Sequence, residues 1–319
     1  MAVPGLAEET GGSTIQNPAA AQALVGIKPT FALVPSTGVM PLSSQREVVS
    51  PIACCMRDAA FVLDVLAGFT MDDPKTVASL GPIPERGHTY LLSDTALQSR
   101  RLGLHGPGWR HQPLTRETAA LYALAQQEFA GRCATLISDP FADLRQPTSE
   151  MNEVDTRGME SVAHDLQDYL CRMGPQAALK SFAQFAEATK SQDPFGPHGL
   201  LQDLHWLPGF TEALAHPDVP PLMAEFITAR ASYLRIFNTI MDKLQIDALF
   251  FPHARAELPP LDGDEQIAET KDSEINIAGL PGVTGPAGAY ACAAPFSLNF
   301  AGRLFSEATQ HRRAPALSH

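Results

Sequence analysis

The feature that most constrains the fold is a strand–helix–strand pattern between residues 101 and 137. Arg101–Leu104 is a short run typical of a strand, and Thr115 is a favourable N-cap for the helix after it. Ala134–Ile137 predicts a second strand. Strands joined by a crossover helix are expected to be parallel, so the pattern predicts an α/β fold. The helix side predicted to meet the sheet carries Leu121, Leu124, Ala125 and Phe129.

Other periodic segments extend this pattern into a mixed sheet within one domain spanning residues 1–319. Ala248–Phe251 is a continuous apolar run closed by Pro252, which is typical of a central strand buried on both faces. We expect this strand to be joined, within one sheet, to an alternating strand at Phe296–Phe300. The further predicted elements are a strand at Gly282–Thr284, helices over Arg57–Ala67 (with Gly68 as C-cap) and most of Leu222–Leu244, and a last helix beginning at Ser306.

Charge and hydropathy exclude several classes of protein. Lys and Arg number 23 and Asp and Glu number 35, which gives a net charge of −12. Such a chain repels phosphates, so we expect no nucleic-acid partner and no anionic membrane surface. No apolar run approaches the ~18–20 residues that span a bilayer. Residues Met1–Thr10 lack the basic and apolar regions of a signal peptide, so a cytoplasmic location is expected.

The cysteines and histidines do not show metal-site spacing. There are five cysteines, an odd number, and Cys54 and Cys55 are adjacent without any C-x-x-C pair. This argues against a disulfide framework or a structural zinc site, and it favours buried free thiols in a reducing compartment. Among the histidines, His253 follows a predicted strand, and we interpret it as a hydrogen-bonded loop histidine rather than a ligand.

The segment with the strongest chemical signal is Glu9–Thr14, which reads Glu-Thr-Gly-Gly-Ser-Thr. Two consecutive glycines allow the backbone to turn sharply and to bring N–H groups close to a substrate carbonyl, where they can stabilise an oxyanion. The hydroxyl of Ser13 would then be placed to attack if a base accepts its proton. Taken alone, the motif is more often a glycine turn followed by a serine helix cap.

The surrounding residues resemble the amidase signature family at both ends of the chain, whereas residues 81–245 match it only in element order. Near the start the family motifs are matched by Gly11-Gly12-Ser13, Pro18-Ala19, Gly26-Ile27-Lys28-Pro29-Thr30 and Gly38-Val39-Met40-Pro41-Leu42. The match continues through Arg57–Ala60 and Leu63–Gly68, and it returns at Asn276–Gly282, Pro286–Gly288, Pro295-Phe296, Gly302-Arg303 and Phe305–Ala308.

This resemblance implies an amidase-signature α/β fold, a mixed sheet covered by helices, and hydrolysis of a small-molecule amide. Ser13 matches the family nucleophile, and the backbone N–H groups of Thr10, Gly11, Gly12 and Ser13 would form the oxyanion hole. In the family a second serine, in a cis peptide, relays the proton to a neutral lysine, and water then hydrolyses the acyl-enzyme. No metal or organic cofactor is implied.

Two departures from the family pattern matter. The family lysine and second serine lie upstream of the Gly-Gly-Ser motif, but residues 1–12 contain neither, so we expect an N-terminally truncated, partial amidase domain. The spacer between Ser13 and Pro18 also has one extra residue, which makes Thr14 an alternative nucleophile. Lys28 is the lysine nearest to Ser13 in sequence and is an alternative base, although the family residue it matches is structural.

Three functions are therefore open: an active amidase, a catalytically inactive paralogue that serves as a structural or interaction module, and one half of a split amidase completed by a separate N-terminal chain. A homodimer is a further possibility. We expect the isolated chain to have little activity and to self-associate.

The site is expected where a helix begins near Pro18, beside Gly282–Gly288. Phe195, Trp206 and Phe210 could line a pocket or pack in a core.

Overall fold

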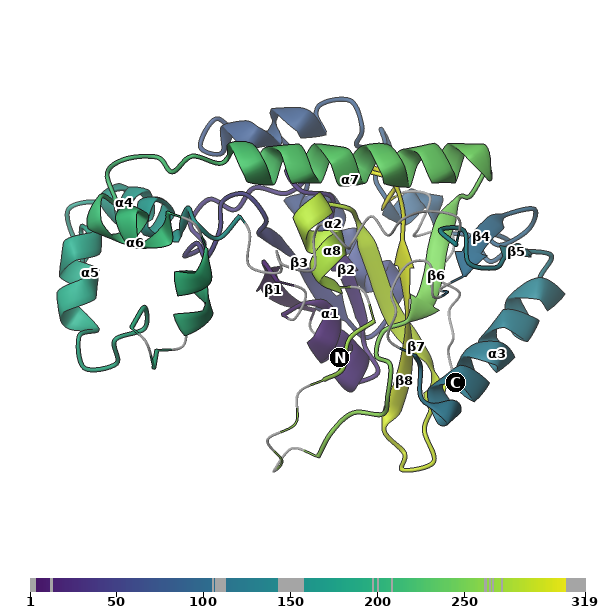
Figure 1. The fold of residues 1–319 in the computed structure, drawn as a ribbon. Helices are drawn as coiled ribbons and strands as arrows, with labels where there is room; N and C mark the ends of the chain where they lie inside the picture. Colours follow the sequence, from purple (N-terminus) through teal and green to yellow (C-terminus); the bar gives the residue numbers. More distant parts are fainter. Residues whose placement is uncertain are drawn as a thin grey trace.

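The computed structural model describes residues 4–11, 14–104, 106, 113–142, 158–196, 198–199, 201–207, 209–260, 263, 265, 267–270 and 272–307. Within these residues the centre of the molecule is a sheet with the strand order β1-β3-β2-β7-β8-β6-β4-β5 (Figure 1). The strands are β1 Gly5–Glu9, β2 Val25–Lys28, β3 Val48–Ala53, β4 Arg101–Leu104, β5 Thr135–Ile137, β6 Ala248–Pro252, β7 Gly282–Ala289 and β8 Pro295–Ala301.

The sheet is mixed, which confirms the predicted fold class. Strand β4 runs parallel to β5 and to β6, as the strand–helix–strand pattern predicts, and the other pairs are antiparallel. Strand β6 pairs directly with β8, with Phe250 opposite Phe300. The predicted connection between the strands near residues 248 and 296 is therefore confirmed. Strand β7 is longer than expected and carries an irregularity in its pairing between Pro286 and Gly288.

The predicted helices around residues 57–67 and 222–244 are present within one or two residues of the expected ends. Thr115 caps α3, because its side chain accepts a hydrogen bond from the backbone N–H of Thr118. Of the helix predicted from Ser306, only the first two residues are described. The helices are α1 Gln16–Ala21, α2 Met56–Leu66, α3 Arg116–Gly131, α4 Val162–Arg172, α5 Phe182–Ala188, α6 Phe210–Ala215, α7 Ala224–Lys243 and α8 Asp272–Ala278, with 3-10 turns η1 Pro74–Ser79, η2 Thr89–Leu91 and η3 Gln202–Trp206.

Strand β6 is buried on both faces, which explains its uninterrupted apolar sequence. Phe250 packs in the core formed with α2 and α3, where its ring lies 4.7 Å from that of Phe129. Leu249 and Phe251 belong to the core on the other face, with Phe237 of α7. Side chains alternate across a strand, so one strand contributes to two cores.

The predicted inner side of α3 needs correction. Leu124 is 61% exposed, whereas Tyr122 is buried and donates a hydrogen bond from its hydroxyl to the carbonyl of Phe250 at 2.6 Å. Tyr122, Ala125 and Phe129 follow each other at helical spacing and form the buried stripe, which leaves Leu124 on the outer side of the helix. A buried tyrosine with a hydroxyl partner is favoured here over a second leucine.

The prediction of buried thiols is wrong. All five cysteines are free and all five are exposed. The reason is their position in connections and at helix ends rather than on inner faces. Cys54 and Cys55 precede α2, Cys133 follows α3 with a positive φ of 66°, and Cys292 lies in the β7–β8 turn.

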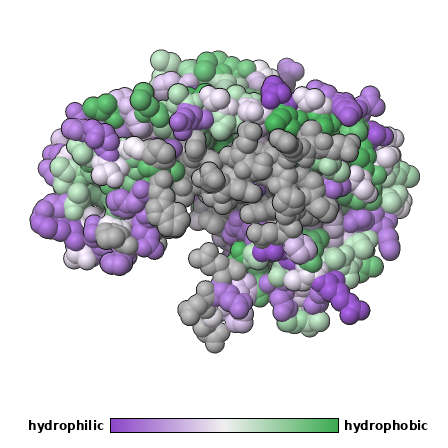
Figure 2. Space-filling view, viewed as in Figure 1, coloured by the Kyte–Doolittle hydropathy of each residue, from purple (hydrophilic) through white to green (hydrophobic). Residues whose placement is uncertain are grey.

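Helices α4, α5 and α6 form a lobe beside the sheet with a core of its own. That core contains Val162, Leu166, Phe182 and Phe210, and Phe210 is fully buried. Figure 1 shows this lobe next to the end of α7, and Figure 2 shows it as a separate projection with a largely hydrophilic outer surface. Core packing is thus the correct interpretation of Phe210, and Phe195 packs against it with ring centroids 6.3 Å apart. The side chain of Trp206 lies outside the described residues.

We predict that Gly26→Ala destabilises the protein by about 1–3 kcal/mol, because overpacking of a rigid core forces its neighbours to move. A Cβ atom at Gly26 of β2 would lie 2.9 Å from the Cβ of Ala19 and 3.1 Å from the carbonyl oxygen of Ile15. Urea unfolding measures the effect. Gly285→Ala on β7 is the matched control, since its added Cβ would meet only Val25, at 4.0 Å. Equal stability of the two variants would contradict the tight α1–β2 contact.

Candidate functional site

The candidate site lies where β1 ends and α1 begins. Of the predicted site residues, Thr10 and Gly11 are described, whereas Gly12 and Ser13 lie outside the described residues. Thr10 is buried and its hydroxyl donates a hydrogen bond to Glu8. Thr14, the alternative nucleophile, is exposed. The geometry of the site is therefore described by the residues that hold the two ends of this turn.

Glu9 holds both ends of the turn together. Its side chain is fully buried, and Oε2 accepts hydrogen bonds from the backbone N–H groups of Ile15 and Gln16, both at 2.9 Å. These N–H groups belong to the first turn of α1, where they have no partner within the helix. Because Ile15, the N-cap residue, provides no side-chain cap, Glu9 caps the helix from the preceding strand.

The second oxygen of Glu9 ties α1 to a distant part of the chain. Oε1 accepts from the side-chain amide of Gln16 at 2.9 Å and from the side-chain amide of Asn276, on α8, at 3.0 Å. Asn276 is itself completely buried. One carboxylate therefore has four donors and joins β1, α1 and α8 below the predicted oxyanion turn.

The polar contacts continue into the central strands. The hydroxyl of Thr284 on β7 lies 3.3 Å from Oε1 of Gln16, and it also contacts the side chain of Asn299 on β8. All three side chains are buried. The helix after the Gly-Gly-Ser motif packs against β7 and begins at Gln16 rather than near Pro18. The expected position of Ser13 beside Gly282–Gly288 lies outside the described residues and stays a prediction.

His253 is a buried structural histidine at the end of β6. Its Nε2 contacts the side-chain oxygen of Asn17, and the Asn17 amide donates to Glu269. Burial lowers the pKa of His253 to about 4, so the imidazole is neutral at physiological pH. This fits the expected hydrogen-bonded histidine, and its partner is the second residue of α1.

Lys28 is buried beneath the same region. Its Nζ donates to the carbonyl oxygen of Leu280 at 2.7 Å and to that of Pro29 at 3.2 Å. Burial lowers the pKa of Lys28 to about 8, and the nearby carboxylates of Glu9 and Glu307 oppose this shift. The contact with Leu280 joins β2 to the turn before β7, which supports a structural role. Its use as a base for Ser13 stays a prediction.

The helical lobe reaches the same turn. A Cβ atom added to Gly11 would lie 3.8 Å from the terminal methyl of Met159, which belongs to the core of the α4–α6 lobe. Met159 thus connects the core of the lobe to the end of β1. In the part of the chain that the structure describes, no three His, Cys, Asp or Glu side chains gather as they would around a metal ion.

Sequence reasoning missed the residues that hold the site. Gln16, Asn276, Thr284 and Asn299 received no role, and Glu9 was noted only as part of the motif. The strand alternation pointed the other way for Asn299, because it occupies the polar position between Leu298 and Phe300 and would be expected to face solvent. In the structure it is fully buried and therefore requires a buried partner.

Comparisons with known proteins identify relatives over almost the whole chain. The family model for amidases matches residues 1–310. The chain is 27% identical to the A subunit of the mitochondrial glutamyl-tRNA(Gln) amidotransferase of Ornithorhynchus anatinus, over 95% of this chain and 56% of that protein. A probable amidase of Arabidopsis thaliana is 36% identical over 99 residues, which are 31% of this chain and 19% of that protein.

The fold also matches solved structures. The peptide amidase from Stenotrophomonas maltophilia superposes with a TM-score of 0.74 and 25% identity, covering 98% of this chain and 61% of that chain. This chain therefore spans between half and two thirds of the length of the amidotransferase subunit and of the peptide amidase. In addition, no described helix combines the length and hydropathy required to cross a membrane.

We predict that Glu9→Gln lowers the free energy of unfolding by about 2–3 kcal/mol, because the new amide nitrogen faces donors where an oxygen accepted two hydrogen bonds. Urea unfolding of the intact chain measures this. The control is Glu85→Gln, which changes an exposed glutamate without a recorded side-chain hydrogen bond. If Glu9→Gln were as stable as the control, the four hydrogen bonds of Glu9 would make no net contribution to the free energy of unfolding.

Proposed function

Because the chain belongs to the amidase family, we propose that it cleaves a carboxamide C–N bond through an acyl-enzyme on Ser13. The observation that carries the proposal is the pair of hydrogen bonds from the N–H groups of Ile15 and Gln16 to Glu9, which join the end of β1 to the start of α1. This connection would hold in place the backbone N–H groups of Thr10 and Gly11 that are expected to stabilise an oxyanion.

The proposed reaction has two steps. Ser13 Oγ bonds to the carbonyl carbon, its proton passes to a base, and the N–H groups of residues 10–13 stabilise the tetrahedral oxyanion. The C–N bond then breaks, the amine leaves with a proton, and an ester to Ser13 remains. Water adds to this ester and releases the carboxylic acid, which restores the serine hydroxyl.

A peptide-like carboxamide is the substrate class we propose first. The support is the similarity to a peptide amidase at 25% identity over nearly the whole chain. The other long match is named as one component of an amidotransferase, which makes an assembly with a second chain a reasonable form of the active protein. A small-molecule amide and a complementing chain are thus the proposed partners.

The second candidate is an amidase-like module that needs another segment for activity. It is favoured by the two backbone carbonyls that already occupy Lys28, the lysine nearest to Ser13 in sequence. Without base assistance, amide hydrolysis would be slower by roughly 10²–10⁴-fold. An activated ester needs less help, because its leaving group departs without a proton.

We predict a burst of p-nitrophenol from p-nitrophenyl acetate, equal to the amount of protein, together with weak hydrolysis of a peptide amide. Acylation of a nucleophilic serine produces such a burst. Ser13→Ala should abolish it and Thr14→Ala should keep it, and mass spectrometry of the acylated peptide locates the ester.

A burst that survives Ser13→Ala but disappears in Thr14→Ala would move the nucleophile to Thr14. Rapid peptide-amide turnover by the purified monomer, lost in Ser13→Ala, would show that the chain carries its own base. In that case Lys28→Met tests whether Lys28 is that base. Absence of any acylation would favour the inactive module.

A further inference from the structure

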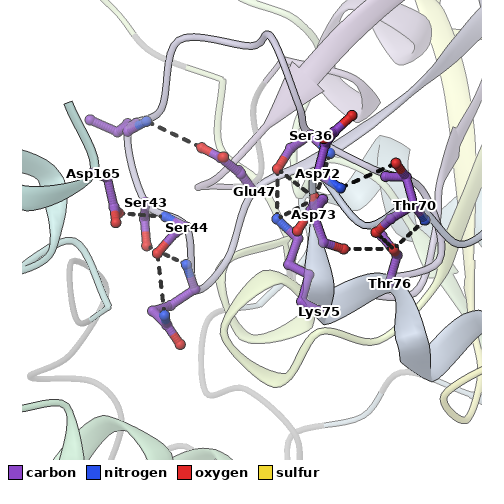
Figure 3. A network of polar contacts seen from close by, with 12 residues as sticks. Ser36, Ser43, Ser44, Glu47, Thr70, Asp72, Asp73, Lys75, Thr76 and Asp165 are labelled. Carbon is purple, nitrogen blue, oxygen red and sulfur yellow. Dashed lines mark hydrogen bonds and ion pairs between the residues drawn. The ribbon is translucent and has the colours of Figure 1, made fainter. Parts of the chain in front are cut away.

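A cavity of about 620 Å³ lies where the connection from β2 to β3 meets η1 and α4. One part of its wall is apolar and includes Phe31, Val39, Met173 and Met223. The other part carries carboxylates from three separate segments. Figure 3 shows Glu47 between the contact of Ser44 with Asp165 on one side and the cluster of Ser36, Asp73 and Lys75 on the other.

Glu47 is the buried carboxylate of this wall. The residue is only 3% exposed, and Oε2 accepts one hydrogen bond, from the backbone N–H of Leu42 at 3.2 Å. Its other oxygen has no hydrogen bond or ion pair with any described residue. Because Glu47 lines the cavity, this oxygen retains its full accepting capacity for a partner that arrives there.

The cationic and titratable nitrogen groups of the wall are already engaged. His164 on α4 lines the cavity, and its Nδ1 contacts the carbonyl oxygen of Pro217 at 3.0 Å. Lys75 lies 3.3 Å from Asp73 and donates to the hydroxyl of Ser36 at 2.6 Å. Arg172 pairs with Asp168 at 3.2 Å. The negative charges of Glu47 and Asp165 are therefore not balanced by an ion pair within the described wall. Among the described residues, Asp165 receives only neutral donors, the N–H of Ser44 at 2.7 Å and the hydroxyl of Ser161 at 2.6 Å.

The electrostatics of Glu47 agree with this imbalance. Burial raises the pKa of Glu47 to about 7. Of the charged groups that act on it, Lys75 on η1 lowers the pKa, whereas Glu8 on β1 and Asp165 on α4 raise it further. A cation placed in the cavity would favour the ionised form of Glu47.

We propose that this cavity binds a primary alkylammonium group, with Glu47 as its direct partner and the apolar wall holding the alkyl chain. An ammonium is a compact charge with three donors, so it can contact the open oxygen of Glu47 without requiring both oxygens. A planar guanidinium would need a bidentate carboxylate, and Leu42 already occupies one oxygen of Glu47. The site does not involve Ser13, so it goes beyond the proposed hydrolysis and can be tested without it.

The cavity nevertheless lies close to the predicted oxyanion turn. In the antiparallel pairing of β1 with β3, Glu8 is opposite Val49 and Glu9 is opposite Val48. The next positions along the two segments are Thr10 and Glu47. An amine held by Glu47 would thus lie beside the strand end that leads into the turn.

Titration calorimetry of the full chain with n-butylammonium chloride tests the proposal, with 1-butanol and butyrate as neutral and anionic probes of similar length. We expect binding of butylammonium alone. Glu47→Gln should weaken it at least ~10-fold, because a neutral amide replaces the charge partner. Asp72→Asn removes an exposed carboxylate at the same cavity and should change the affinity by less than about threefold, as exposed charges are screened.

Two further measurements keep the test independent of how Glu47→Gln folds. Lys75→Met should strengthen binding, because it removes the competing cation and frees Asp73. For the native chain, affinity should rise about tenfold from pH 6 to pH 8 as Glu47 ionises around its pKa of about 7. Unchanged binding in Glu47→Gln with a native circular dichroism spectrum, butyrate binding in place of butylammonium, or no binding at any pH would overturn the proposal.

Discussion

The carboxylate of Glu9 is the contact on which the candidate site depends. It accepts four hydrogen bonds in a place that solvent does not reach, and its donors come from residues 15, 16 and 276. A buried charge is stable only when donors surround it, so removing any one partner exposes the rest of the group to a desolvation cost. The turn after β1 is therefore fixed by residues that lie 7 and 267 positions away in sequence.

The sheet allows this contact because its central strands are covered on both faces. Strand β6 places Phe250 against α2 and α3, and Leu249 and Phe251 against α7. Because both faces of the sheet are covered, polar side chains on β7 and β8 need partners within the protein. Thr284 contacts both Asn299 on β8 and Gln16 on α1, and this contact helps to determine where α1 lies.

Local sequence patterns predicted much of the fold but few of the contacts that hold the candidate site. They correctly predicted that residues 248–251 are buried on both faces and that Thr115 caps a helix, because both features depend on residues close in sequence. The prediction that Leu124 faces the sheet was wrong, because α3 can be rotated about its axis in several ways that each bury apolar residues. The observed rotation buries Tyr122, whose hydroxyl donates a hydrogen bond to Phe250. The partners of Glu9 could not be predicted, because Asn276 is brought to it only by the finished fold.

Glu9, the last residue of β1, and Glu47, which directly precedes β3, show how one residue type serves two purposes. Both are buried, yet Glu9 has four donors, whereas Glu47 has the single N–H of Leu42. A saturated carboxylate has no capacity for a ligand and acts as a structural tie. A carboxylate with an unused oxygen at a cavity wall can still gain a partner when a ligand binds, which is the condition for a recognition site. Glu9 has more donors than Glu47 because Gln16 and Asn276 contact it, and no described residues play the same part around Glu47. The number of donors therefore gives Glu9 a structural role and leaves Glu47 able to bind a ligand in the cavity.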